Sequence, residues 1–220
     1  MRRRFRPLVA ATAVALAVSS AAGAADPGKE KIRFNAADQA AARAAILRRS
    51  DLGPGWSGGR KKPDLSLGPT CPNYHPKQSD LVLTGAAESE FRRTGMDVDN
   101  EVQVLQTARM VSLDWQRAVL APGALPCLRR DLAKGLGTTA TIVSFRRLAF
   151  PKLTRYTAAF RVVVAVTISG TTIRVVVDAV LVGRGRSEIT LDVAAPAAVA
   201  APLPAAERRL ARKILARAQV

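Results

Sequence analysis

The stretch RYTAAFRVVVAVTISGTTIRVVVDAVLVG, residues 155–183, decides the fold class. It holds two long runs rich in Val, Ile and Thr, joined by the sequence SGTT at residues 169–172. Runs of β-branched residues on either side of a glycine turn predict a hairpin of two long strands. The segment SEITLDVAA, residues 187–195, predicts a third antiparallel strand, so the C-terminal half is expected to form a β-meander.

Outside the meander, the periodicity of the apolar residues predicts further strands and four helices. DNEVQVLQTA, residues 99–108, alternates polar and apolar side chains, which is typical of a half-buried strand. Two more strands are expected at residues 80–93 and 139–148, and helices at residues 36–50, 108–120, 125–137 and 205–219. The last helix is basic. We expect it to pack Leu210 and Ile214 on the sheet, with a position on an anionic membrane surface as the alternative.

The order α, β, β, α, α, β, β, β, β, α keeps helices and antiparallel strands partly segregated. This pattern predicts an α+β fold, with a single antiparallel sheet that ends in the meander and is flanked by helices. The chain has 220 residues, of which 48% are hydrophobic and 23% are charged, so it can bury an ordinary core. We find no internal repeat, and predict one domain over residues 25–220.

The N-terminus has the pattern of a secretory signal peptide. Arginines at positions 2, 3, 4 and 6 precede the apolar run Leu8 to Val18, and Ala22-Gly23-Ala24 supplies the small residues of a cleavage site. The apolar run is shorter than the roughly 20 residues of a membrane-spanning helix. We therefore predict a signal peptide at residues 1–24, cleavage after Ala24, and a secreted, extracytoplasmic protein.

The chain is strongly basic, with a formal net charge of +17 at pH 7. The predicted leader holds four arginines and no acid, so the mature chain would keep a net charge near +13. Such a charge favours anionic partners, and outside the cytoplasm these are acidic envelope polymers and lipid surfaces. A GC-rich genome could also produce this arginine bias without selection for binding. No nucleic-acid partner is expected, because basic residues are not interleaved with stacking aromatics and no known module is visible.

The two cysteines, Cys71 and Cys127, are expected to form a disulfide in an oxidising compartment. Cys71 lies in TCPNYHPKQSD, residues 70–80, together with His75, the one histidine of the chain. Structural zinc sites use four ligands and usually closely spaced cysteines, which this sequence does not offer. We therefore expect no metal and no cofactor.

Catalytic patterns are weak, so we favour a non-enzymatic protein and keep a secreted hydrolase as an alternative. His75 is the sole candidate base for a Ser-His-Asp triad, with Ser79 and Asp80 nearby, and no G-x-S-x-G motif is present. Glu88 and Glu90 would share one face of a strand, as a glycosidase pair could. A second acidic group is interpreted as a solvated turn: Asp97, Asp99 and Glu101. No catalytic residue is assigned.

Three amphipathic aromatics, Trp56, Tyr74 and Trp115, are candidates for lining a ligand pocket, although core positions would suit them equally. A ligand, if the protein binds one, is expected between the sheet and the helix that carries Trp115.

Three segments carry a family resemblance: ILRRSDLGPGW at residues 46–56, TARMVSLDWQRAVL at 107–120 and PCLRRDL at 126–132. Together they resemble actinobacterial exported proteins related to the extracellular sensor-like domains of receptor kinases and to small envelope lipoproteins. The resemblance implies a helix-flanked sheet with a cleft for an unknown ligand, located in the cell envelope. The chain departs from that group in lacking a kinase domain, a transmembrane helix and a lipobox cysteine. The expected function is a secreted ligand-binding or sensor-like accessory module, with a basic polyanion-binding surface protein as a further alternative.

Overall fold

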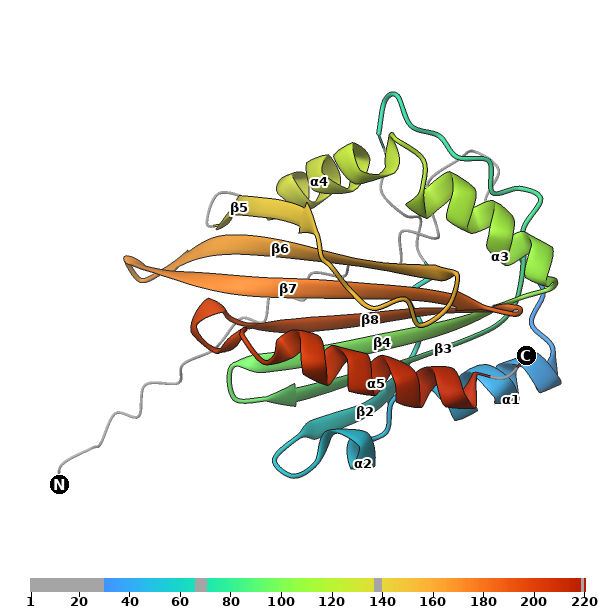
Figure 1. Ribbon diagram of the computed structural model, residues 1–220, viewed down its shortest axis with the longest axis horizontal. Coiled ribbons are helices and arrows are strands. Elements are labelled where there is room, and N and C mark those ends of the chain that lie inside the picture. Colours follow the sequence, from blue (N-terminus) through green and yellow to red (C-terminus); the bar gives the residue numbers. More distant parts are fainter. Residues whose placement is uncertain (1–29, 66–70, 137–139, 219) are drawn as a thin grey trace, which may run out of the picture.

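The computed structural model describes residues 30–65, 71–136, 140–218 and 220, and the predicted leader lies outside them (Figure 1). Its centre is one eight-stranded, mostly antiparallel sheet with the order β1-β3-β4-β8-β7-β6-β5, in which β2 also pairs with β3. The strands are β1 (Lys31–Ile32), β2 (Ser57–Lys61), β3 (Val82–Arg93), β4 (Met96–Leu105), β5 (Ala140–Arg147), β6 (Tyr156–Ile168), β7 (Thr171–Arg184) and β8 (Ser187–Pro196). The helices are α1 (Ala36–Ala45), α2 (Arg49–Leu52), α3 (Ala108–Asp114), the π-helix η1 (Trp115–Val119), α4 (Ala124–Gly135), the 3₁₀ turn η2 (Ala197–Val199) and α5 (Leu203–Arg217).

The predicted α+β class and the C-terminal meander are confirmed. β5 pairs with β6, β6 with β7 and β7 with β8, all antiparallel. The turn between β6 and β7 places Ser169 and Gly170 at φ values of 49° and 79°. Two successive positive φ values suit a tight hairpin, because their twist matches that of the flanking strands.

One face of the sheet carries the main apolar core and is covered by α1 and α5 (Figure 1). Phe91, Val102 and Leu191 point to this face from β3, β4 and β8, and they pack with Ala42 of α1 and Ile214 of α5. The small alanine of α1 lets this helix lie close to the sheet, and the isoleucine of α5 fills the space beneath the C-terminal helix. The C-terminal helix is thus a core element, as its apolar stripe predicts.

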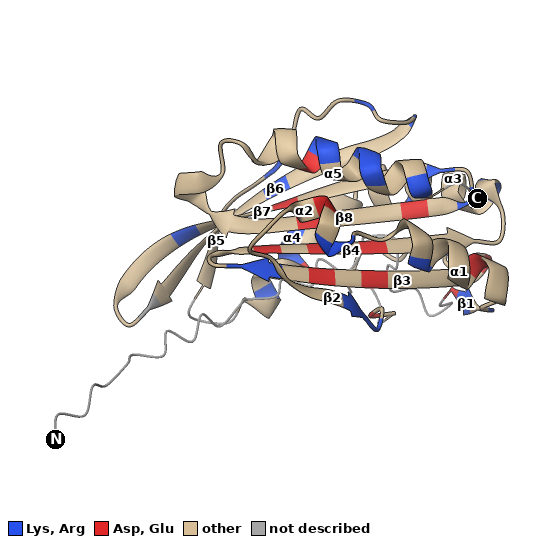
Figure 2. Cartoon of the chain, turned by 90° about the horizontal axis from the view of Figure 1, so that it is seen from below, with Lys and Arg blue, Asp and Glu red and all other residues tan. Residues whose placement is uncertain are grey.

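The opposite face, covered by α3, η1 and α4, is divided into an apolar and an acidic half. Over β5, β6 and β7 it is apolar, with Val162 and Val164 packed against Leu132 of α4. Over β3, β4 and β8 the strand register places acids side by side, as in the directly opposed pair Glu88 and Glu101 (Figure 2). Four carboxyl side chains are buried here: Glu88, Glu101, Glu188 and Asp192.

This arrangement corrects the sequence-based view of the acids. Asp97, Asp99 and Glu101 were expected in a solvated turn, but all three lie on β4. The directly opposed carboxylates of Glu88 and Glu101 would repel. Lys61 of β2 offsets this repulsion, since its Nζ lies 2.8 Å from Glu88 and 2.8 Å from Asp99.

The predicted disulfide is confirmed. Cys71 and Cys127 are joined, with their Cα atoms 5.6 Å apart, and the bond ties the loop before β3 to α4. In the part of the chain that the structure describes, no helix is long and apolar enough to cross a membrane.

Candidate anion-binding groove

The three aromatics considered for a ligand pocket do not come together. Trp56 packs on the α1/α5 side of the sheet, where the Arg93 guanidinium lies 5.1 Å from its ring centroid. Trp115 is buried on the opposite face, 5.5 Å from the ring of Tyr156. Tyr74 lies near η1, and its hydroxyl donates to the backbone carbonyl of Arg117. The sheet therefore separates Trp56 from the other two.

The cavity beneath Trp115 is very small. It has a volume of about 10 Å³, which is room for about one water molecule. Side chains from β4, α3 and β8 line it, including Gln103, Asp114 and Glu188. An organic ligand does not fit into this cavity as it stands.

Buried carboxyl groups fill this part of the molecule. Asp114 is fully buried and accepts a hydrogen bond from Gln78 Nε2 at 2.9 Å. Burial raises the pKa of Asp114 to about 7. Burial, and then the nearby charges of Asp114 and Glu30, raise the pKa of Glu188 well above its usual range. Glu188 therefore keeps its proton near neutral pH. In the described residues no group of three or more His, Cys, Asp or Glu is arranged to hold a metal ion.

His75 and its neighbours do not assemble a catalytic relay in the described coordinates. A ring nitrogen of exposed His75 lies 3.0 Å from the carbonyl oxygen of Pro72. The carboxylate of Asp80 instead accepts hydrogen bonds from Arg117, the shorter at 2.6 Å. The bond from Arg117 lowers the pKa of Asp80 to about 2. This carboxylate is therefore engaged by arginine rather than by His75.

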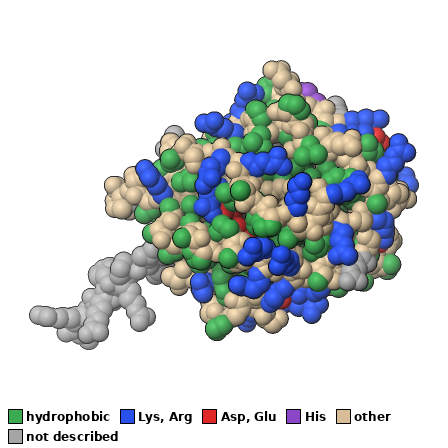
Figure 3. Space-filling model, viewed as in Figure 1, with side chains coloured by type: hydrophobic (Ala, Val, Ile, Leu, Met, Phe, Trp, Pro, Cys, Tyr) green, Lys and Arg blue, Asp and Glu red, His purple; other side chains and the backbone are tan. Residues whose placement is uncertain are grey.

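Charges of opposite sign are segregated between the interior and the surface. Among the residues that the structure describes, Asp64 is the one exposed acid, whereas nearly all Lys and Arg are exposed. The exceptions are half-buried, and each is paired with a carboxylate: Arg117 with Asp80, Arg161 with Asp178, Arg186 with Asp38 and Arg217 with Asp51. The charged side chains on the surface are consequently mostly cations, as the face drawn in Figure 3 shows.

A groove of about 650 Å³ lies between α1, α2 and β2. Small residues make its walls: Ala40 and Ala44, one turn apart on α1, and Gly58 and Gly59 on β2. Its floor is apolar and consists of Ile46, Leu47 and Phe91, each 2% exposed. The hollow exists because the side chains along its walls are short or absent.

Four arginines line the groove: Arg43, Arg48, Arg49 and Arg60. Among the residues that the structure describes, no carboxylate belongs to this lining. Arg48 Nη2 donates to the carbonyl of Ala44, and Arg49 Nη2 donates to the carbonyl of Gly58, both at 3.2 Å. Bonds to neutral carbonyls orient these guanidinium groups but do not neutralise them. Within the described residues none of the four arginines takes part in an ion pair, so the groove concentrates uncompensated positive charge.

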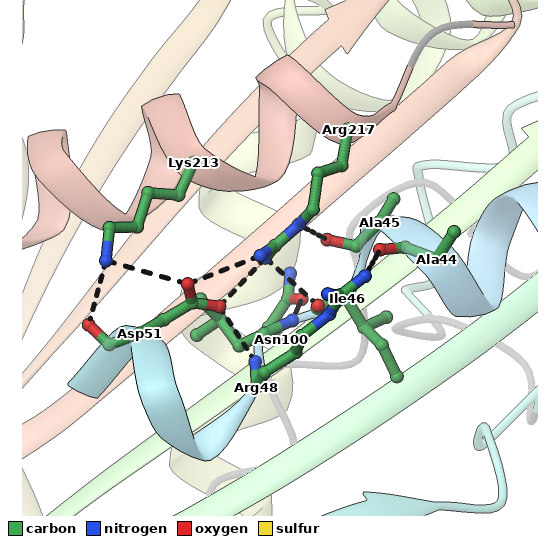
Figure 4. Close-up of polar contacts among 9 residues, drawn as sticks. Ala44, Ala45, Ile46, Arg48, Asp51, Asn100, Lys213 and Arg217 are labelled. Carbon is green, nitrogen blue, oxygen red and sulfur yellow. Dashed lines mark hydrogen bonds and ion pairs between the residues drawn. The ribbon is translucent and has the colours of Figure 1, made fainter. Parts of the chain in front are cut away.

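The frame of the groove is fixed by Asp51 of α2 (Figure 4). Its carboxylate contacts Arg217 Nη2 at 2.9 Å and Lys213 Nζ at 3.6 Å, and it accepts a hydrogen bond from the backbone N–H of Arg48 at 2.9 Å. Burial alone would raise the pKa of Asp51, but the bonds from Arg217 and Arg48 outweigh it and lower the pKa. Asp51 therefore stays ionised and ties α2 to the C-terminal helix.

A second set of bonds holds the connection between α1 and α2. Arg217 donates from Nε to the carbonyl of Ala45 at 3.2 Å and from Nη2 to the carbonyl of Ile46 at 3.1 Å. The backbone N–H of Leu47 donates to Asn100 Oδ1 of β4 at 2.9 Å. These contacts reach from both α5 and the sheet, so the groove is preformed.

Neither protein-family models nor curated protein sequences match this chain. The functional argument therefore rests on the geometry and charge of the groove. Sequence reasoning missed its residues, although the pair Arg48-Arg49 beside a Gly-rich segment is visible in the sequence. What the sequence did not reveal is that the glycines at 58 and 59 form a strand beside α1.

Proposed function

We propose that this chain is an extracytoplasmic, non-enzymatic binding module for anionic ligands, with the groove between α1, α2 and β2 as its main site. The observation that carries the proposal is the set of four unpaired arginines around a preformed hollow whose lining has no carboxylate. It joins two of the sequence-based alternatives, the ligand-binding module and the polyanion-binding surface.

Arginine suits this role for a physical reason. The planar guanidinium presents a fork of N–H donors that matches the oxygens of phosphate and carboxylate groups, and it stays charged at all relevant pH values. Like charges held close together repel, and a bound anion relieves that repulsion. The volume of about 650 Å³ also lies in the range of roughly 300–1,000 Å³ typical of small-ligand sites.

The proposed location follows from the disulfide and from the leader-like N-terminus. A bond such as Cys71–Cys127 is characteristic of oxidising compartments outside the cytoplasm. There the abundant anions are acidic envelope polymers and lipid headgroups rather than nucleic acids. A sensor-like role within the envelope remains part of this proposal through the resemblance at residues 46–132.

Binding of fluorescently labelled polyphosphate, measured by anisotropy at low and high salt, tests the proposal. We expect saturable binding at low salt that weakens as salt screens the charges. The double variant Arg48→Ala/Arg60→Ala should weaken binding by about tenfold or more, because hydrogen bonds to charged groups contribute about 1.5–3 kcal/mol each.

The matched control is Arg208→Ala/Arg209→Ala, which removes the same charge from exposed positions on α5. We expect this control to weaken binding much less. Equal losses in the two double variants would contradict the groove as the main site, and an absence of binding at low salt would contradict the proposal as a whole.

A further inference from the structure

From the make-up of the groove we infer the class of its ligand: a polyol or sugar that carries two phosphoryl groups. The carbon skeleton lies along the alanine wall of α1, and the phosphoryl groups lie at the arginines. This inference rests on the proposed function and narrows it to one kind of anion.

The number and origin of the arginines point to two phosphoryl groups. Arg43 lies on α1, whereas Arg48 is the N-cap residue of α2, Arg49 begins α2 and Arg60 lies on β2, so cations line the groove from both of its sides. A single carboxylate has two oxygens and is saturated by one bidentate guanidinium. A phosphoryl group has three terminal oxygens and can accept from two guanidinium groups at once. Two phosphoryl groups therefore match four arginines.

The surface between the arginines points to a short, hydroxylated skeleton. Its exposed apolar atoms are mainly the methyl groups of Ala40 and Ala44, since the larger floor residues are almost completely buried. Apolar burial stabilises by only about 25 cal/mol per Å², so a few methyl contacts would hold an acyl chain poorly. They are sufficient for the C–H groups of a sugar or a glycerol unit.

The edge of β2 provides partners for hydroxyl groups. Within the described strands β2 pairs with β3 alone, so its other edge presents backbone groups that the sheet does not use. The Gly58 carbonyl already accepts a bond from Arg49 Nη2, and its second lone pair can accept from a ligand hydroxyl. A Cβ at Gly58 would lie 2.2 Å from the Glu90 carbonyl oxygen, so this position must remain glycine for β2 to approach β3 so closely.

Calorimetric titration with three probes tests the ligand class. Fructose 1,6-bisphosphate offers two phosphoryl groups on a polyol skeleton, fructose 6-phosphate offers one, and inorganic tripolyphosphate offers charge without a skeleton. We expect the bisphosphate to bind at least about tenfold more tightly than the monophosphate, because the monophosphate lacks the charge-assisted hydrogen bonds of the second phosphoryl group. We also expect it to bind more tightly than tripolyphosphate, although tripolyphosphate carries more charge.

The variant Ala44→Leu separates this inference from the proposed function. It fills the groove wall without changing the net charge, at an exposed helix position where leucine is a good helix former. We expect it to weaken bisphosphate binding by about tenfold or more while polyphosphate binding falls less. Ala205→Leu, at an exposed position on α5, is the matched control and should leave both affinities unchanged.

The outcomes are distinguishable. Equal affinity for mono- and bisphosphate, tighter binding of tripolyphosphate, or no effect of Ala44→Leu overturns the ligand class, even if polyphosphate binding through Arg48 and Arg60 stands. Loss of all anion binding overturns both claims.

If the ligand class holds, a competition experiment identifies the source of the ligand. A short glycerol phosphate oligomer and glycerol phosphate itself are compared as competitors of the bisphosphate. If the oligomer displaces the bisphosphate at a lower concentration, the site is assigned to a phosphodiester polymer. If the two competitors act at equal concentrations, the site is assigned to a free polyol phosphate.

Discussion

Glu188→Gln should remove one of the buried groups that make the stability of this protein depend on pH. Glu188 of β8 and Asp114 of α3 line the small cavity beneath Trp115, and both carboxyls are buried. Burial, followed by the charges of Asp114 and Glu30, raises the pKa of Glu188, so the folded protein keeps a proton here that the unfolded chain releases. A glutamine has nearly the same shape but has no proton to retain.

The magnitude follows from linkage. A carboxyl whose pKa is raised on folding binds its proton more tightly in the native state, so the free energy of unfolding falls as pH rises above the unfolded pKa. Each retained proton lowers the free energy of unfolding by about 1.4 kcal/mol per pH unit between the unfolded and the native pKa. We therefore expect the variant to match the wild-type protein within about 1 kcal/mol at pH 5, and to gain stability relative to it by about 1.4 kcal/mol per pH unit above that for as long as Glu188 keeps its proton.

Urea unfolding followed by tryptophan fluorescence at several pH values measures this difference. Asp131→Asn, at a half-buried position on α4, is the control, because it removes a carboxyl that lies outside the cavity beneath Trp115. Parallel profiles for Glu188→Gln and the wild-type protein would refute the reasoning, because they would mean that no proton is retained at this site.

Three further predictions concern the contacts that hold the fold. Reduction of the disulfide, which spans 56 residues, should lower the free energy of unfolding by about 4 kcal/mol, and a loss below about 1 kcal/mol in urea unfolding would contradict this. Asp51→Ala removes the contacts of α2 with Arg217 and Lys213. We expect faster amide hydrogen exchange at residues 47–52 and unchanged exchange in β7. Unchanged exchange in α2 would show that these contacts do not anchor this helix. Asp178→Ala removes the carboxylate that pairs with Arg161 of β6, whose side chain is 14% exposed, and should cost about 3–5 kcal/mol in thermal unfolding. A loss below about 1 kcal/mol would count against a buried pair.

Much of the fold was predictable because local and global signals agree. The β6–β7 hairpin has β-branched residues throughout its strands and a turn at Ser169-Gly170 that suits two positive φ values. The disulfide was predictable because the chain has two cysteines and a leader-like N-terminus. The hairpin is predicted by residues that are close in sequence. The disulfide is predicted because each cysteine has one possible partner in the chain.

Other features depend on contacts between distant segments. β2 lies outside every strand that the sequence predicts, since Gly58 and Gly59 have low strand propensity, and it forms because the edge of β3 offers it a partner. The buried acids of β4 were expected in solvent, because the sequence does not reveal the register that sets Gln103 opposite Glu188. The local sequence around these glycines and acids does not indicate their environment, because that environment is set by pairing with a strand distant in the sequence.

The groove was not predictable for the same reason. Arg48 and Arg49 resemble any basic helix end, and the small residues at 40, 44, 58 and 59 give no sign of a shared hollow. The hollow forms because Asp51 is held by Arg217, which is 166 residues away in the chain. Sequence periodicity reports which face of an element is buried, but it does not report which two elements lie beside each other.

The central claim, that anions bind in the groove between α1, α2 and β2, is tested most directly by nuclear magnetic resonance. Titration of the ¹⁵N-labelled protein with fructose 1,6-bisphosphate reports on both backbone amides and arginine Nε groups. We predict that the largest shifts occur at Gly58 and Gly59 and at the Nε groups of Arg48, Arg49 and Arg60. Shifts spread evenly over the exposed arginines, or concentrated on α5, would contradict the account.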